Sequence, residues 1–315
     1  MEFIRKAIRI REFVLLMVIL VLSVFFSFTS PYFLTLGNWE AIAFGMLSDC
    51  IIAVGMVVVI VGGGFDLSVG ATLALCGIIV AKLLNAGIPI WLAISLGGIL
   101  LGAGIGLFNG FLITKAQINP FVVTLGMMSI GRGTGLAITQ GRPLAGLPDA
   151  FDFIGQGYIF GFPFAIALMI VIVVVGDYLM RQTRWLRQVY YVGGNEEAAR
   201  FSGINVDRVR TASYVLIGIL AGVAGVVTTS RMSSIMATAG LGTELRAIAA
   251  VVIGGGSLSG GKGSVFGAFL GTLLLGIITD ILILYRVSVY YQQVVSGAIL
   301  ILVVAIDTLS RMRKA

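Results

Sequence analysis

The chain has 315 residues, of which 58% are hydrophobic and 11% are charged, and its mean hydropathy is +1.07. Because soluble domains carry about 25% charged residues, this composition excludes a water-soluble fold and predicts an integral membrane protein. The net charge of +7 does not require a nucleic-acid partner, since the basic residues gather in loops expected on the cytoplasmic side.

Ten apolar segments, most of them close to the roughly 20 residues that a helix needs to cross a bilayer, follow one another along the chain. Their long apolar runs predict α-helices and not the strands of a barrel, in which apolar and polar residues alternate. The eighth segment is shorter than the others. The segments cover residues 13–30, 41–61, 66–84, 89–113, 120–138, 161–180, 211–229, 242–256, 264–284 and 289–308.

The basic residues predict the orientation of these segments. If the N-terminus is cytoplasmic, ten crossings return the C-terminus to the same side, and most of the 21 Lys and Arg residues then face the cytoplasm. Two loops are long, 139–160 on the outside and the highly charged 181–210 on the inside. No linker divides the chain, so the sequence predicts one all-α polytopic membrane domain over residues 1–315, with about ten transmembrane helices and both termini cytoplasmic.

The stretch GGGFDLSVG, residues 62–70, interrupts the helical pattern. An ionisable group inside the membrane is costly unless it is paired or hydrated, so Asp66 and the neighbouring Ser68 are candidates for the translocation path or a gate. The alternative is that Asp66 caps the third helix, with Leu67 at its first position. Asn109, in the fourth segment, is a further path candidate, or it bonds to a neighbouring helix.

Glu244 and Arg246 lie at the outer end of the eighth segment, where an entering solute would meet them; solvation at the membrane surface accounts for them equally well. The chain has no histidine, and its two cysteines show no metal-binding spacing. No metal site and no catalytic constellation are therefore expected, and the sequence predicts a protein that is not an enzyme.

The inside loop, about 181–210, contains a short helix with defined ends. Asn195 is a good N-cap, Glu196 and Glu197 complement the dipole in the first turn, and Gly203 can close the helix in a left-handed conformation. The residues of this segment, called the docking helix below, are Gly194, Asn195, Glu196, Glu197, Ala198, Ala199, Arg200 and Gly203.

A helix this short is not stable in water by itself, so packing has to hold it. It is either a solvated connector packed on the protein's own membrane helices, or a coupling helix that enters a groove on another protein and receives mechanical work from it.

The stretch GGGSLSGGKGS, residues 254–264, contains G-x-x-x-x-G-K, the beginning of a nucleotide-binding P-loop. A P-loop needs Ser or Thr directly after the lysine, and Gly263 stands there. It also follows a β-strand, whereas this stretch lies between two predicted membrane helices. The glycines predict instead a tight cytoplasmic connection between the eighth and ninth segments, or a gating hinge.

Four blocks, in chain order, resemble the ribose-type permeases, the membrane subunits of bacterial ATP-binding-cassette (ABC) importers for sugars, a family that also includes autoinducer-2 permeases. Two positions depart from the usual family pattern: Arg246 replaces an acidic residue, and Phe65 replaces isoleucine. The blocks are GGGFDLSVGATLAL (62–75), FNGFLITKAQINPFVVTLGMMSIGRG (108–133), YYVGGNEEAARFSGINVDRVR (190–210) and GTELRAIAAVVIGGGSLSGGKGSVFGAFLGTLLLG (242–276).

The resemblance implies a type II ABC-importer-like permease in the bacterial cytoplasmic (inner) membrane. Two permease subunits, identical or related, would form the pathway, two cytoplasmic ATPase subunits would bind ATP and power it, and an extracytoplasmic binding protein would deliver the solute. The permease itself would hold no cofactor. The docking helix corresponds to the family's coupling helix.

The resemblance leaves the solute open among ribose, another pentose or hexose, and autoinducer-2. A different class of function is a secondary transporter driven by protons or sodium. Ion coupling favours a network of acidic residues or histidines at mid-membrane, whereas this chain has scattered acids and no histidine.

Overall fold

The computed structural model describes the backbone of residues 2–312 and the side chains of residues 11–299, 301, 302 and 305. The described residues are mostly helical and include a two-stranded antiparallel hairpin. In chain order the elements are α1 (Glu2–Thr29), α2 (Leu36–Gly45), α3 (Leu47–Val61), α4 (Val69–Asn85), α5 (Ile90–Ala93), the π-helix η1 (Ile94–Leu100), α6 (Leu101–Thr114), α7 (Pro120–Thr139), α8 (Asp149–Gln156), β1 (Tyr158–Ile159), β2 (Phe162–Pro163), α9 (Phe164–Gln182), α10 (Arg184–Gly194), α11 (Glu196–Phe201), α12 (Val206–Met232), α13 (Thr243–Ile253), α14 (Val265–Leu284) and α15 (Val289–Met312).

Helices occupy all ten predicted apolar segments, which confirms an all-α membrane protein. Within the described residues, six helices are long and apolar enough to cross a bilayer, and α2 with α3, bent by 48°, makes a seventh candidate. The eighth predicted segment is different: α13 has 11 residues, about 16 Å of helix, which covers roughly half of the hydrocarbon layer. A stretch made mostly of turns, residues 233–242, leads into it.

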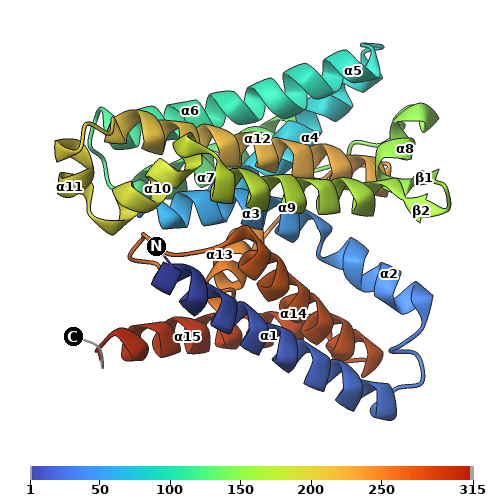
Figure 1. Cartoon of the computed structure of the whole chain (residues 1–315). Helices are drawn as coiled ribbons and strands as arrows, with labels where there is room; N and C mark the ends of the chain where they lie inside the picture. Colours follow the sequence, from blue (N-terminus) through green and yellow to red (C-terminus); the bar gives the residue numbers. More distant parts are fainter. Residues whose placement is uncertain (1, 313–315) are drawn as a thin grey trace.

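The two ends of the molecule differ in what they carry. Figure 1 shows the chain termini at the same end as α10 and α11, while α8 and the β1–β2 hairpin lie at the opposite end. The predicted inside loop and both termini therefore share one side of the bundle.

Helix α12 forms the centre of the bundle, and it approaches α6 closely because glycines face each other along the contact. Gly102 and Gly106 of α6 lie against Gly218 and Tyr214 of α12, and a methyl group at either α6 glycine would overlap a carbonyl oxygen of α12. Such stripes of small residues at four-residue spacing let membrane helices pack through their backbones.

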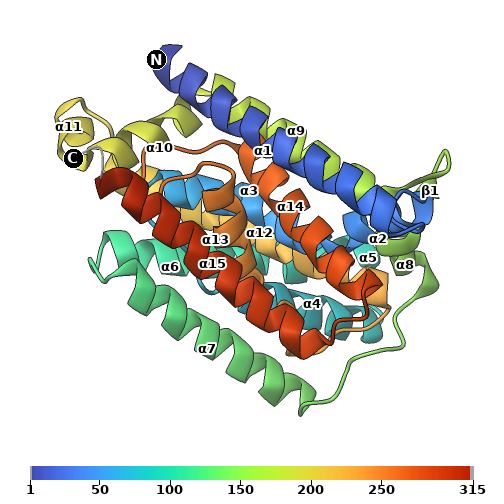
Figure 2. The same cartoon turned by 90° about the horizontal axis from the view of Figure 1, so that it is seen from below.

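Burial separates an inner from an outer layer. All residues of α3 except Ser48 are buried, whereas the outer helix α1 exposes apolar side chains such as Phe25 and Phe28. In Figure 2, α1 with α9 and, on the opposite side, α7 form the edges of the molecule. Exposed apolar side chains on such edges suit contact with lipid.

Both long loops contain helices that the sequence reading did not identify. The outside loop contains α8 and ends in the β1–β2 hairpin, and the inside loop contains α10 before the docking helix. The missed signal in α10 is the spacing of Leu186, Val189 and Val192, which lie three apart and are buried.

Candidate functional site

The docking helix is the helix α11, and its predicted ends are confirmed. The side chain of Asn195 accepts a hydrogen bond from the backbone N–H of Ala198 at 2.9 Å. At the other end, Gly203 has φ = +81°, and the N–H of Ile204 donates to the carbonyl of Ala199 at 3.0 Å. Both ends therefore use the local caps that the sequence specifies.

One side of α11 packs on the protein and the other is open. Ala199 is buried, whereas Glu197 and Ala198 are exposed, and the Phe201 side chain is 92% exposed. Glu197, Ala198 and Phe201 therefore make up the open side of α11.

Ion pairs connect α11 to its neighbours. Glu196 pairs with Arg200 at 3.0 Å and with Arg210 of α12 at 2.7 Å. Arg200 also reaches Asp207 at 3.1 Å, and Lys115, after α6, pairs with the same carboxylate at 3.0 Å. The network therefore joins the docking helix to α12 and to the α6–α7 connection.

The pKa of Glu196 reflects this network. Partial burial by itself would raise that pKa, but the hydrogen bonds and charges of Arg200 and Arg210 outweigh burial and hold it below its ordinary value of 4.5. Glu196 is therefore a stable anion at neutral pH.

Beneath the docking helix, three glycine-containing connections meet. The N–H of Gly261 donates to the carbonyl of Val61 at 2.8 Å, and the hydroxyl of Tyr190 in α10 donates to the carbonyl of Gly263 at 2.8 Å. A side chain at Gly193 would overlap the Val61 carbonyl, and one at Gly260 would lie 2.5 Å from the carbonyl oxygen of Gly193. These contacts define the glycine junction, where the end of α10 touches the α3–α4 and α13–α14 connections.

The glycine junction explains the glycine cluster at 254–264. This cluster connects α13 to α14, as the sequence predicts, and it follows a helix and not a strand. Ser264 is the N-cap of α14, accepting from the N–H of Gly267 and donating to Glu12 of α1.

A polar cleft of about 340 Å³ opens beside this junction. It extends from the glycine turn after α3 to the charged side chains of α11 and the start of α12. Its walls combine backbone of Gly62, Gly63 and Gly64 with the side chains of Tyr214, Glu196, Arg200, Asp207 and Arg210.

The path candidates Asp66, Ser68 and Asn109 come together in one buried cluster. A carboxylate oxygen of Asp66 accepts from the N–H of Ser68 at 2.7 Å and from its hydroxyl at 2.6 Å. Asn109 donates to the Ser68 hydroxyl at 3.0 Å, and its own side-chain oxygen is buried without a partner among the described residues. The cap prediction is wrong in register, because Leu67 and Ser68 form a turn, α4 begins at Val69 and Ser68 is its N-cap residue. The Asp66 side chain nevertheless accepts from the N–H two residues on, as a capping side chain does.

The candidates Glu244 and Arg246 lie in the first turns of α13 but have different partners. Arg246 makes a two-pronged ion pair with Asp49 of α3, at 2.6 and 3.2 Å. Glu244 is buried, and one of its oxygens accepts only from the N–H of Gly242, at 3.2 Å, while the other has no partner in the described chain.

Arg132 of α7 is the charged residue that sequence reasoning missed. It donates to the carbonyls of Ala237 and Ala239 at 2.7 and 2.6 Å, in the stretch before α13. Its lone charge within the apolar segment 120–138 is a signal that could have identified it, because intramembrane charges mark functional positions.

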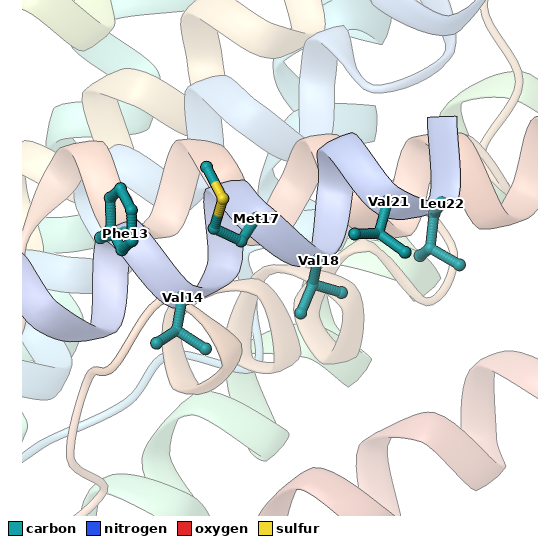
Figure 3. A pocket seen from close by; sticks show the side chains of 6 residues that line it. All are labelled: Phe13, Val14, Met17, Val18, Val21 and Leu22. Atoms are coloured by element: carbon teal, nitrogen blue, oxygen red, sulfur yellow. The ribbon is translucent and has the colours of Figure 1, made fainter. Parts of the chain in front are cut away.

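A second hollow runs along the outer face of α1 and is lined entirely by apolar side chains, which Figure 3 shows projecting from this one helix. With no polar group to orient a solute, this face suits lipid acyl chains. The lining residues are Phe13, Val14, Met17, Val18, Val21 and Leu22.

Comparison with known proteins adds an independent finding. The profile of the family described as branched-chain amino acid transport system / permease component matches residues 41–304. The chain is 40% identical to the ribose import permease protein RbsC of Escherichia coli K12 over 93% of this chain and 92% of that protein. It is 42% identical to the ribose import permease RbsC of Bacillus subtilis, over 91% and 89%. With the L-arabinose ABC transporter permease AraH of Azospirillum brasilense the identity is 37%, over 94% and 87%. No solved structure matches.

Proposed function

The chain belongs to the family of branched-chain amino acid transport system permease components, and on that premise we propose that it is the multi-pass inner-membrane permease subunit of an ABC importer for a ribose-like sugar. The observation that carries this proposal is the 37–42% identity to ribose and arabinose permeases over more than nine tenths of the chain. The relatives' names favour a sugar over an amino acid as the solute.

The partners follow from the same premise. A cytoplasmic ATPase binds and hydrolyses ATP, an extracytoplasmic binding protein delivers the sugar, and a second permease copy completes the pathway. The permease performs no chemistry and holds no cofactor of its own. The open side of α11, with Glu197 and Phe201, supports the assignment of this helix as the ATPase docking point.

The glycine junction supports a route for mechanical work. Since Gly193 and Gly260 are packed backbone to backbone, a displacement of α10 and α11 presses on both adjoining connections. One connection leads to Asp66 and Ser68, and the other leads directly into α13 and α14. In this proposal the ATPase moves the docking helix, and the junction transmits that motion to the elements carrying the path residues.

The path residues are then Asp66, Ser68 and Asn109 toward the cytoplasm and Glu244 and Arg246 toward the outside. The hydrogen-bonded group of Asp66, Ser68 and Asn109 and the separate ion pair of Arg246 with Asp49 support this division. Arg246 acts mainly through Asp49, since its guanidinium is already paired.

Reconstitution tests the proposal. The permease is placed in liposomes with its ATPase subunits, loaded binding protein outside and ATP inside, and uptake of labelled D-ribose is measured. Uptake is expected to require the ATPase and to persist when an uncoupler collapses ion gradients. Uptake by the permease alone, driven by a proton or sodium gradient, would instead identify an ion-coupled secondary transporter.

A further inference from the structure

Glu244 and Arg132 carry opposite charges that lie near each other without a direct ion pair, and they are called the open pair below. Glu244 is 8% exposed, and its Oε2 has no partner in the part of the chain that the structure describes. The Nε of Arg132 is likewise buried without a partner. A buried polar atom left unpaired is costly, so such atoms normally have a partner. Here the two unpaired atoms belong to side chains of opposite charge that form no direct ion pair. This arrangement indicates a site at which a third group binds to both.

Gly70 shows how close these two charges lie. A Cβ built on Gly70 would be 2.6 Å from Oε2 of Glu244 and 3.3 Å from Nη2 of Arg132. The two side-chain atoms are therefore at most 5.9 Å apart. The same Cβ would lie 2.2 Å from the carbonyl oxygen of Gly240, so a side chain at Gly70 would displace both the stretch before α13 and the Glu244 carboxylate.

One hydroxyl group has a reach close to this upper bound. A hydroxyl oxygen that accepts from a guanidinium and donates to a carboxylate spans about 5.6 Å at most, from ordinary hydrogen-bond lengths. Glu244 repels an anion and Arg132 repels a cation, whereas a neutral polyol satisfies both. The chemistry of the pair therefore selects a hydroxyl-bearing solute.

The surrounding contacts keep the pair open. Arg132 is anchored through Nη1 to the carbonyls of Ala237 and Ala239, which leaves its other nitrogens available toward Glu244. Arg246 is held by Asp49, so it does not neutralise Glu244 by direct contact. Arg246 and Asp49 therefore neutralise each other, and neither of them pairs with Glu244 or Arg132.

The pair is also near a surface of the subunit. Leu241 and Leu245, on either side of Glu244, are 63% and 47% exposed. Figure 2 views the face of the molecule that carries α7, α13 and α15. The first turn of α13 therefore lies close to the surface of the subunit, although the Glu244 carboxylate itself is buried.

We propose that Glu244, Arg132 and Gly70 form a hydroxyl-binding station in the translocation path, at which one hydroxyl of the sugar bridges the carboxylate and the guanidinium. The proposal rests on the function proposed above. It assigns Arg132 and Gly70 roles that the motifs did not reveal, and it gives Glu244 a defined one.

Binding to the permease alone tests the station. Thermal unfolding of the full chain in lipid nanodiscs is followed against D-ribose concentration, because a ligand that binds only the folded state raises Tm. Glu244→Gln and Arg132→Lys are each expected to raise the apparent Kd for D-ribose at least about tenfold, the loss of one charge-assisted hydrogen bond. Gly70→Ala is expected to raise it because the added methyl group displaces the carboxylate and the Gly240 carbonyl. The matched controls are Glu40→Gln, an acid on α2, and Gly133→Ala, beside Arg132 with no atom within 4 Å of the added methyl group.

A second measurement separates binding from stability. At saturating binding protein, import of D-ribose is compared with import of its singly deoxygenated analogues. The wild type is expected to discriminate against the analogue that lacks the bridging hydroxyl, and Glu244→Gln is expected to lose this discrimination.

The outcomes distinguish the two proposals. A sugar-dependent rise in Tm that is equal in the wild type and all three variants would overturn the hydroxyl-binding station. Unchanged discrimination between D-ribose and its deoxygenated analogues in Glu244→Gln would overturn it too, and would indicate that a structural water bridges the two charges. A wild type that binds D-ribose through these residues but shows no ATP-driven import would sink the proposed function and leave the station standing.

Discussion

The docking helix and the first turns of α13 both carry paired acids and arginines, but the two regions use charge differently. At α11, Glu196 and Arg200 are substantially exposed, and their partners lie in neighbouring turns or just across a loop. At α13, Glu244 and Asp49 are buried, and Arg246 reaches a residue 197 positions away in sequence. Exposed pairs contribute little to stability, whereas a buried charge that loses its partner costs several kcal/mol. The difference indicates that the first region orients a surface and the second holds the membrane core in register.

The largest effect is expected when the left-handed glycine that ends the docking helix is replaced. Gly203→Pro removes a backbone donor and requires a negative φ where the chain has +81°, so α11 should lose its shape. We expect ATPase co-purification and sugar uptake to fall at least about tenfold, with normal membrane insertion. Gly146→Pro, at φ = +76° on the opposite side of the bundle, is the matched control. Full uptake by Gly203→Pro would contradict the assignment of α11.

A charge reversal on α11 tests the same assignment without altering the backbone. Glu197→Lys changes an exposed side chain in the first turn of α11, and we expect weaker ATPase association, measured by pull-down, with an unchanged Tm of the isolated permease. Asp149→Lys makes the same change in the first turn of α8, at the other end of the molecule, and should leave association intact. Equal behaviour of the two variants would show that α11 is an ordinary connector.

The buried pair at α13 is expected to dominate stability. Asp49→Asn leaves the Arg246 guanidinium without its carboxylate and should lower the free energy of unfolding by about 2 kcal/mol, less than for a fully buried pair because Arg246 is partly exposed. A double-mutant cycle with Arg246→Gln measures the coupling. If the two losses simply add, the ion pair does not hold α3 and α13 together.

The smallest effect concerns Glu196 and its pH dependence. Because the arginines lower its pKa in the folded state, its contribution is present above the ordinary value and disappears as pH falls through the lowered one. Glu196→Gln should therefore reduce stability by less than about 1 kcal/mol at pH 7. The difference from wild type should persist at pH 5.5 and vanish in strong acid, as monitored by chemical unfolding. A difference that grows on acidification would contradict this sign.

Much of the fold could be predicted from the sequence because a membrane-spanning helix requires an uninterrupted apolar run of about 20 residues. The ten apolar segments all contain helices, and the ends of α11 were predicted residue by residue from Asn195 and Gly203. The start of α4 was misplaced by two residues because Leu67 and Ser68 form a turn before the helix begins at Val69. Helix α10 was missed because its three buried residues are few and lie among arginines.

The sequence by itself determined the membrane class, the long apolar helices, the caps of α11 and the resemblance to sugar permeases, because these depend on composition and on residues within a few positions of one another. Only the tertiary structure decided which charges meet. The pairing of Asp49 with Arg246, the approach of Arg132 to the stretch before α13, and the position of Gly70 against Glu244 join helices far apart in the chain. In a membrane interior each charge requires a partner, but the identity of that partner depends on how the helices pack, and a linear pattern does not contain that information.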